Sequence, residues 1–173
     1  MLERIANIAV IAGVTLFFAL AAKDYLARHN QPVPGKFPDP LAIARSELIG
    51  KPLGPVGGLV FPRQRPSILL ALSTACHFCK DSEPFYRQLS TRVSGKVDLI
   101  ALFPQPLPEA SAYARDHIPT ATVLSGPLES IHVAATPTLI LVDRSGKVRE
   151  VWVGRLNSSR EQEVLSRILS IKD

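Results

Sequence analysis

The sequence predicts an α/β fold, built around a mixed β-sheet in the C-terminal two thirds of the chain. Short apolar runs, as expected of strands, alternate there with segments that have a helical spacing of apolar residues. Two further strands, at 138–142 and 148–153, flank a turn sequence at 143–146 and predict a hairpin. Strands that alternate with helices indicate a layered α/β domain, and the closing hairpin makes its sheet mixed.

Each expected element has a local reason. Residues 67–73 form a nearly continuous apolar run, which is typical of a buried central strand. The helix after it places Phe85 and Leu89 on one face, and Pro84 should kink it. Residues 148–153 alternate with a period of two, as a returning strand does. The expected strands are 67–73, 97–103, 120–124, 138–142 and 148–153, and the expected helices are 76–91, 108–117 and a last helix capped by Ser158 or Ser159.

The first 28 residues are expected to form a membrane anchor. An uncharged stretch of 18 residues runs from Ile5 to Ala22. A helix of that length spans about 27 Å, close to the bilayer core of about 30 Å, so the stretch can reach across the lipid bilayer. The alternatives are a signal peptide cleaved near residues 19–21 and a buried soluble helix.

A proline-rich tether should follow the anchor. Residues 30–66 hold eight of the 15 prolines, which precludes a long helix and favours extended chain. We expect residues 29–47 to be this tether, with one or two helical turns within 41–49. A short strand is expected at 59–61, after a glycine-rich turn. The globular domain then spans residues 48–173.

The net charge of +5 lies mainly in the first 66 residues, with eight Lys and Arg against four Asp and Glu, whereas the rest has twelve against eleven. No basic stripe interleaved with aromatic residues is present in the domain, so nucleic acid is not an expected partner. Lys23, Arg28 and Lys36 follow the apolar segment, and this count alone would place the domain in the cytoplasm. We expect the extracytoplasmic (periplasmic) side, because the cysteine chemistry described next favours it.

The chemistry is concentrated in Cys76-His77-Phe78-Cys79, which holds the only two cysteines and opens a predicted helix. Unpaired N–H groups at a helix N-terminus stabilise an anion, so the pKa of Cys76 should be lowered. His77, when protonated, should favour the thiolate further. Cys79 lies deeper and should be the resolving thiol, which displaces the product after Cys76 has attacked a substrate disulfide. This chemistry needs no cofactor.

Other uses of the two cysteines stay open. A static disulfide is one, and half of a zinc site is another, although no second Cys-x-x-Cys motif supplies the remaining ligands. Cys76, Cys79 and His132 could instead form a copper-binding module, because soft thiolates suit Cu(I). A peroxiredoxin-like peroxidase would want a threonine three residues before the reactive cysteine, where this chain has Ser73. We expect no metal at the pair.

A second motif supports the redox interpretation. Thr136-Pro137-Thr138 stands directly before the strand at 138–142, where a proline costs a ladder hydrogen bond. Together with the cysteine motif and Pro84, this pattern resembles the thioredoxin superfamily over residues 48–171. The anchor and the extra strand and helix resemble its membrane-anchored TlpA-like branch. The resemblance implies a cis Thr136–Pro137 bond beside the cysteines, and a Thr136 backbone that pairs with the substrate.

Two of the positions that depart from the family pattern bear on proton transfer. Thioredoxins proper carry a buried aspartate in the strand before the motif, as a proton relay, where this chain has Leu70. The cytochrome-maturation reductases usually carry a glutamate where this chain has Ser82, and Glu83 on a helix would point about 100° away.

The resemblance therefore implies a membrane-tethered, extracytoplasmic thiol–disulfide oxidoreductase. Its partners would be protein thiols or disulfides and a membrane or extracytoplasmic redox protein. The direction of the reaction stays open, and cytochrome c maturation is one of the reductant roles.

Overall fold

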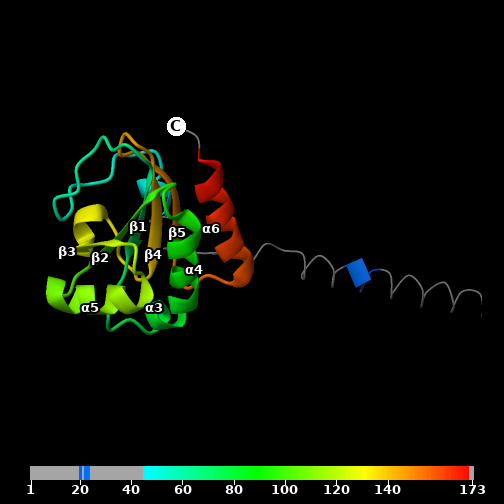
Figure 1. Ribbon diagram of the computed structural model, residues 1–173. Coiled ribbons are helices and arrows are strands. Elements are labelled where there is room, and N and C mark those ends of the chain that lie inside the picture. Colours follow the sequence, from blue (N-terminus) through cyan, green and yellow to red (C-terminus); the bar gives the residue numbers. More distant parts are fainter. Residues whose placement is uncertain (1–19, 21, 24–44, 172–173) are drawn as a thin grey trace, which may run out of the picture. The chain divides into compact units, whose positions relative to one another are not determined.

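The computed structural model describes residues 20, 22, 23 and 45–171 of the chain. Within this range it confirms an α/β fold with one mixed sheet (Figure 1). The strands are β1 (Ser67–Ala71), β2 (Asp98–Phe103), β3 (Thr122–Ser125), β4 (Thr138–Val142) and β5 (Val148–Val153), and the helices are α3 (His77–Asp81), α4 (Glu83–Val93), α5 (Leu107–His117), the 3-10 helix η1 (Leu128–Ile131) and α6 (Ser158–Ser170).

The sheet has the strand order β3-β2-β1-β4-β5. β1 pairs in parallel with β2, and β2 with β3, whereas β4 runs antiparallel to both β1 and β5. In β1 and β4, Ala71 pairs with Thr138. The segment that follows β1 and the segment that precedes β4 therefore lie at the same end of the sheet, and these two segments hold the two predicted motifs.

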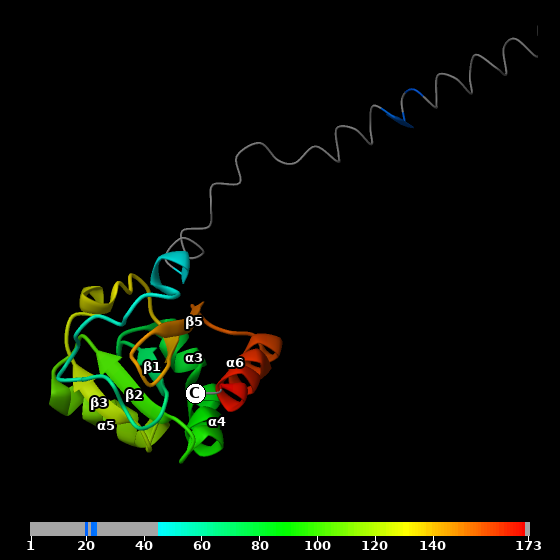
Figure 2. The ribbon, with the colours of Figure 1, turned by 90° about the horizontal axis from the view of Figure 1, so that it is seen from above.

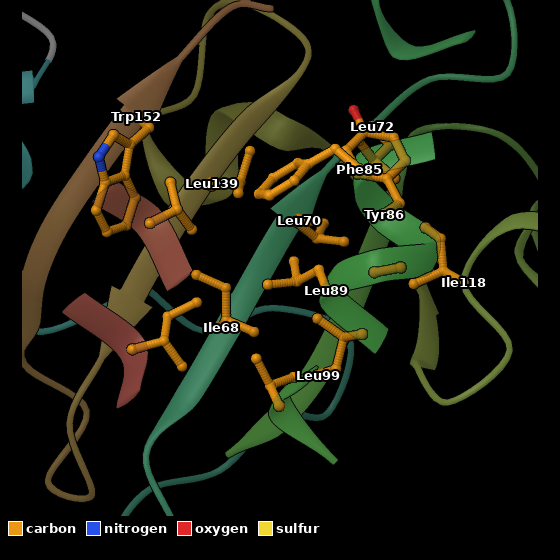
Figure 3. Close-up of a cluster of buried hydrophobic side chains, with 14 of the residues drawn as sticks. Ile68, Leu70, Leu72, Phe85, Tyr86, Leu89, Leu99, Ile118, Leu139 and Trp152 are labelled. Atoms are coloured by element: carbon orange, nitrogen blue, oxygen red, sulfur yellow. The ribbon is translucent and has the colours of Figure 1, made fainter. Parts of the chain in front are cut away.

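Two apolar layers cover the faces of the sheet. All five residues of β1 are buried, and they alternate between the two faces as strand geometry requires. Ile68 and Leu70 pack on the side of α4, α5 and α6, where Figure 3 shows them beside Leu89 and Leu139. Leu69 and Ala71 belong to the opposite layer, which the segment from Leu48 to Val56 and helix η1 complete. Helices α4 and α6 lie side by side in both ribbon views (Figure 2).

The expected helix over 76–91 is divided into two helices at Ser82. Helix α3 ends at Asp81 and α4 begins at Glu83, with Pro84 in the first turn of α4. A proline lacks the N–H group but fits a first turn, where that group has no helical partner. The sequence therefore places a new helix start where we expected only a kink.

The predicted cap of the last helix is wrong. Neither Ser158 nor Ser159 caps α6, because the N-cap residue is Asn157. Its side-chain oxygen accepts a hydrogen bond from the Arg160 N–H at 3.0 Å. Asparagine and serine are about equally good N-cap residues. Asn157 is the cap because it lies three residues before Arg160, where its side chain can accept the N–H of that residue.

The expected strand at 59–61 is also wrong. Val56 and Leu59 form only an isolated antiparallel bridge across Gly57 and Gly58, whose φ angles are +52° and +80°. The chain therefore reverses where we expected it to extend. Pro62 follows directly, and its missing N–H cannot contribute to a ladder.

The predicted anchor, apart from residues 20, 22 and 23, and most of the tether lie outside the described residues. Among the residues that the structure does describe, no helix is long and apolar enough to cross a membrane. Residues 45–48 form a helical turn, as expected for the segment 41–49. From this turn the Arg45 Nε donates to the Val151 carbonyl on β5 at 2.6 Å.

Candidate active site

Cys76 is the N-cap residue of α3, so the prediction that the motif opens a helix is confirmed. Its backbone is extended, with φ −82° and ψ 118°, and its Sγ accepts the N–H of Cys79 at 3.3 Å. Its own N–H donates to the Ser73 carbonyl at 3.1 Å. The sulfur of Cys76 therefore takes the place of a capping oxygen, and a thiolate there is stabilised by an N–H that has no helical partner.

The two thiols differ in their readiness to ionise. Burial alone would raise the pKa of Cys76, but hydrogen bonds from the Thr136 and Cys79 side chains and from the N–H groups of Cys79 and Phe78 hold that pKa below its ordinary 9.0. Cys79 is fully buried, and burial raises its pKa to about 12. Both are free thiols in this structure. At neutral pH, Cys76 is therefore the better nucleophile of the pair.

The second motif meets the first at Cys76. The thiol of Cys76 donates to the Thr136 carbonyl at 3.3 Å, across 60 residues of sequence. The Thr136–Pro137 peptide bond is cis, as the resemblance implies. Pro137 is buried, and its carbonyl accepts the Gly154 N–H at 2.7 Å. This hydrogen bond ties the loop before β4 to Gly154, the residue that follows β5.

His77 lies on the outer side of α3. Its side chain is 81% exposed, and its Nε2 lies 3.5 Å from Asp81 Oδ2, one helical turn on. The same oxygen accepts from Arg155 Nη1 at 3.1 Å. Sequence reasoning missed Asp81 and Arg155, which link α3 to the loop after β5. The spacing of His77 and Asp81 by four residues is the local signal that could have found the first contact.

Sequence reasoning also missed a polar cluster between α4 and α5. Glu83 Oε2 and Arg87 Nη2 lie 3.2 Å and 3.0 Å from His117 Nδ1. The ring of His117 lies 4.6 Å, between centroids, from that of Tyr113, which packs against the apolar core that includes Cys79. Each helix contributes a pair of residues four apart, a spacing that brings side chains to one face. The sequence shows this four-residue spacing within each helix, but it does not show that the two helix faces meet.

The metal and peroxidase alternatives involve His132 and Ser73, whose positions the structure gives. In the part of the chain that the structure describes, no three His, Cys, Asp or Glu side chains are grouped so as to hold a metal ion, and His132 with the two thiols is not such a group. The Ser73 hydroxyl accepts from Gln105 Nε2 at 2.8 Å and from the Ala75 N–H at 3.3 Å. It therefore braces the loop before the motif.

Comparison with protein-family models and with curated proteins finds no match, whereas solved structures do match. A putative thiol:disulfide interchange protein DsbE from Chlorobium tepidum gives a TM-score of 0.56 at 19% identity, over 71% of this chain and 97% of that one. A putative thioredoxin from Neisseria meningitidis gives 0.56 at 13%, over 71% and 93%. The exposed lipoprotein thioredoxin Etrx1 of Streptococcus pneumoniae gives 0.52 at 16%, over 70% and 99%.

At such identities the likeness is one of fold. The α/β part of the expected architecture is confirmed, because the described residues have the thioredoxin-like fold with a mixed five-stranded sheet flanked by helices. On that fold, Cys76 and Cys79 stand at the N-terminus of a helix, beside a cis-proline loop. The chain thus has a thioredoxin-like fold that carries a close Cys-x-x-Cys pair.

Proposed function

We propose that this protein is a membrane-tethered thiol–disulfide oxidoreductase that acts outside the cytoplasm on protein thiols and disulfides. The observation that carries the proposal is the inequality of the two thiols. Hydrogen bonds to Cys76 hold its pKa below 9.0, whereas burial raises that of Cys79 to about 12. A purely structural disulfide has no need of one activated, partly exposed sulfur and one protected sulfur.

The exchange proceeds in two steps. The Cys76 thiolate attacks one sulfur of a substrate disulfide, so a bond forms at Cys76 Sγ and the other substrate sulfur leaves as a thiolate. Cys79, once deprotonated, then attacks Cys76 Sγ and releases the second substrate thiolate. The substrate gains two electrons and the pair becomes a disulfide, which a redox partner protein must reduce again. The reverse sequence oxidises a substrate dithiol, and cytochrome c maturation is one setting for the reductant direction.

Thr136 and Pro137 are the proposed substrate-binding residues. The ladder between β1 and β4 begins at Thr138, so the backbone of Thr136 is not used by the sheet. Its carbonyl lies 3.3 Å from Cys76 Sγ, where the backbone of an extended substrate segment would pass. Backbone pairing of this kind binds substrates of varied sequence. His77 is the proposed tuning residue, since a protonated ring next to Cys76 in sequence favours its thiolate.

The tether and the location belong to the same proposal. The uncharged stretch from Ile5 to Ala22 is the proposed anchor. The pneumococcal protein of similar fold is described as an exposed lipoprotein, which supports an extracytoplasmic domain. A reporter enzyme that is active only outside the cytoplasm, fused after Asp173, should therefore be active. Activity of a cytoplasmic reporter alone would place the domain inside.

The exchange is tested on the full-length protein in detergent micelles, with insulin as the disulfide substrate and a small dithiol as reductant. We expect turnover by the native protein and none by Cys76→Ser. Cys79→Ser should accumulate a mixed disulfide on Cys76, which mass spectrometry of the unreduced protein detects. Ser145→Ala, a substitution in the distant hairpin turn, controls for loss of activity during preparation of the variants. Undiminished turnover by Cys76→Ser, or a substrate adduct on Cys79, would contradict the assignment.

A further inference from the structure

The resolving step requires Cys79 to lose a proton, and β1 provides no acid–base group for this. Leu70 stands where thioredoxins proper carry an aspartate, and it is fully buried in the apolar core. Ser82, at the second family position, donates its hydroxyl to the Phe78 carbonyl at 2.8 Å. Because burial raises the pKa of Cys79 to about 12, little thiolate forms at neutral pH without help. A proton acceptor must come from another element.

The polar cluster between α4 and α5 can exchange protons. Glu83 Oε2 and Arg87 Nη2 both approach His117 Nδ1, at 3.2 Å and 3.0 Å. A neutral ring can accept the hydrogen bond from Arg87 through Nδ1, whereas a ring protonated at Nδ1 donates to Glu83. One nitrogen thus has a partner in either protonation state. The side chains of His117 and Glu83 are 20% and 21% exposed, so this end of the cluster reaches solvent.

Tyr113 extends the cluster toward Cys79. Its ring lies against that of His117, and it packs on the core that contains Cys79. Its hydroxyl oxygen is buried and makes no hydrogen bond of ordinary length among the described residues, which is costly for a polar group, but a longer hydrogen-bond interaction with the Glu83 side chain contributes to its raised pKa. Burial raises the pKa of Tyr113, and the charges of Glu83 and Cys79 raise it further. The hydroxyl is therefore within electrostatic reach of both the thiol and the carboxylate.

We propose that Tyr113, Glu83 and His117 carry the proton that Cys79 gives up, from the buried thiol to solvent. The inference rests on the proposed function and adds the residues that deprotonate its resolving cysteine. The Cys79 S–H bond breaks as its proton passes, through a hydrogen-bonded water, to Tyr113 Oη, and Tyr113 gives its own proton to the Glu83 carboxylate. Glu83 gives that proton to Nδ1 of His117, and the ring releases the proton of its other nitrogen, Nε2, to water. The Cys79 thiolate then attacks Cys76, and no electrons move in the proton steps.

The remaining titratable groups near Cys79 fit this route without joining it. Cys76 is the electrophile of the step. Tyr86, on α4, also has a buried hydroxyl that makes no hydrogen bond of ordinary length among the described residues. Burial and the charge of Cys79 raise its pKa, which a longer hydrogen-bond interaction with Ser82 offsets in part. Its side chain is fully buried in the core, so it offers no exit to solvent (Figure 3). Asp98, on β2, pairs with Ser67 at the opposite end of the sheet.

The route is tested by the reaction of the reduced full-length protein with the aryl disulfide DTNB. Attack by Cys76 releases one nitrothiobenzoate and closure by Cys79 releases a second, so stopped-flow absorbance resolves the two steps. We expect Tyr113→Phe and Glu83→Gln to slow the second step about a hundredfold at neutral pH, the contribution of one positioned acid–base group. The first step should not change. The slowing should fade as pH rises toward the pKa of Cys79, near 12.

Tyr86→Phe is the matched control, because it also removes one buried hydroxyl near Cys79, and it should leave the second step unchanged. Equal slowing by Tyr86→Phe, slowing that does not depend on pH, or no slowing by Tyr113→Phe would overturn the route. If the native protein released no second nitrothiobenzoate, the proposed function would fail instead. In that case, alkylation of Cys79 in the Cys76→Ser variant tests the proton route separately. Adding Tyr113→Phe to this variant should slow the alkylation at neutral pH. An unchanged rate would contradict the route.

Discussion

Replacing Cys76 by serine leaves Cys79 as the only thiol, and alkylation of that thiol should then require strongly alkaline pH. Burial is the largest cause of its raised pKa, and burial does not depend on Cys76. The rise from 9.0 to about 12 amounts to about three pKa units. The thiolate fraction at neutral pH is then about a thousandfold below that of an ordinary thiol. The hydrogen bond and charge of Cys76 contribute to the rise, so this factor is an upper bound.

The assay is iodoacetamide labelling as a function of pH, followed by mass spectrometry under anaerobic conditions. The midpoint pH of the labelling rate is the quantity to compare, because burial also slows access of the reagent and lowers every rate. Cys79→Ser provides the matched variant, and its Cys76 should show a midpoint below 9.0. A midpoint for Cys79 at or below 9.0, or one below that of Cys76, would refute the assignment of the two roles.

Three further predictions concern single residues. Asn157→Ala should lower the free energy of unfolding in urea by about 1 kcal/mol, whereas Ser158→Ala should have little effect. Burial would raise the pKa of Asp143, but hydrogen bonds from Ser145 and Lys147 and the charge of Arg149 hold that pKa below 3.8. The ionised Asp143 side chain therefore stabilises the folded protein above pH 3.8, and this stabilisation is lost as pH falls through the folded-state pKa. The difference in the free energy of unfolding between the native protein and Asp143→Asn, measured in urea, should therefore become smaller at acid pH. His77→Ala should raise the labelling midpoint of Cys76, and an unchanged midpoint would remove its tuning role.

The parts of the fold that sequence predicted best are those where one local pattern has no rival. The strands at 138–142 and 148–153 were predicted with the bounds they have, because apolar content, alternation and the turn between them all agree. The prediction of a strand at 59–61 was wrong because it gave more weight to the apolar residues there than to the two preceding glycines, which reverse the chain. The 3-10 helix η1 was missed, since four residues are too few to show a period.

The candidate site divides in the same way. The cysteine pair could be placed from its spacing and from the strand before it, because the N-terminal turn of a helix is a local structure. The contact of Cys76 with Thr136 came only from the family resemblance. Glu83 and His117 are 34 positions apart, on two helices, and nothing in either helix indicates the angle at which they pack. Their meeting is a tertiary fact that helical spacing alone cannot predict.

The register between β1 and β4 decides whether the cysteine motif and the Thr136 loop meet. Ala71 opposite Thr138 sets the loop containing Thr136 level with the cap residue Cys76, five positions beyond Ala71. A slip of one residue would exchange the two faces of β4, because side chains alternate along a strand. Leu139 and Leu141, which pack with the helices, would then turn to the other layer, and Ile140 would take their place. The apolar residues of β4 therefore fix the position of Thr136, so the distance between the Cys76 thiol and the Thr136 carbonyl, at one end of the sheet, depends on packing in the interior.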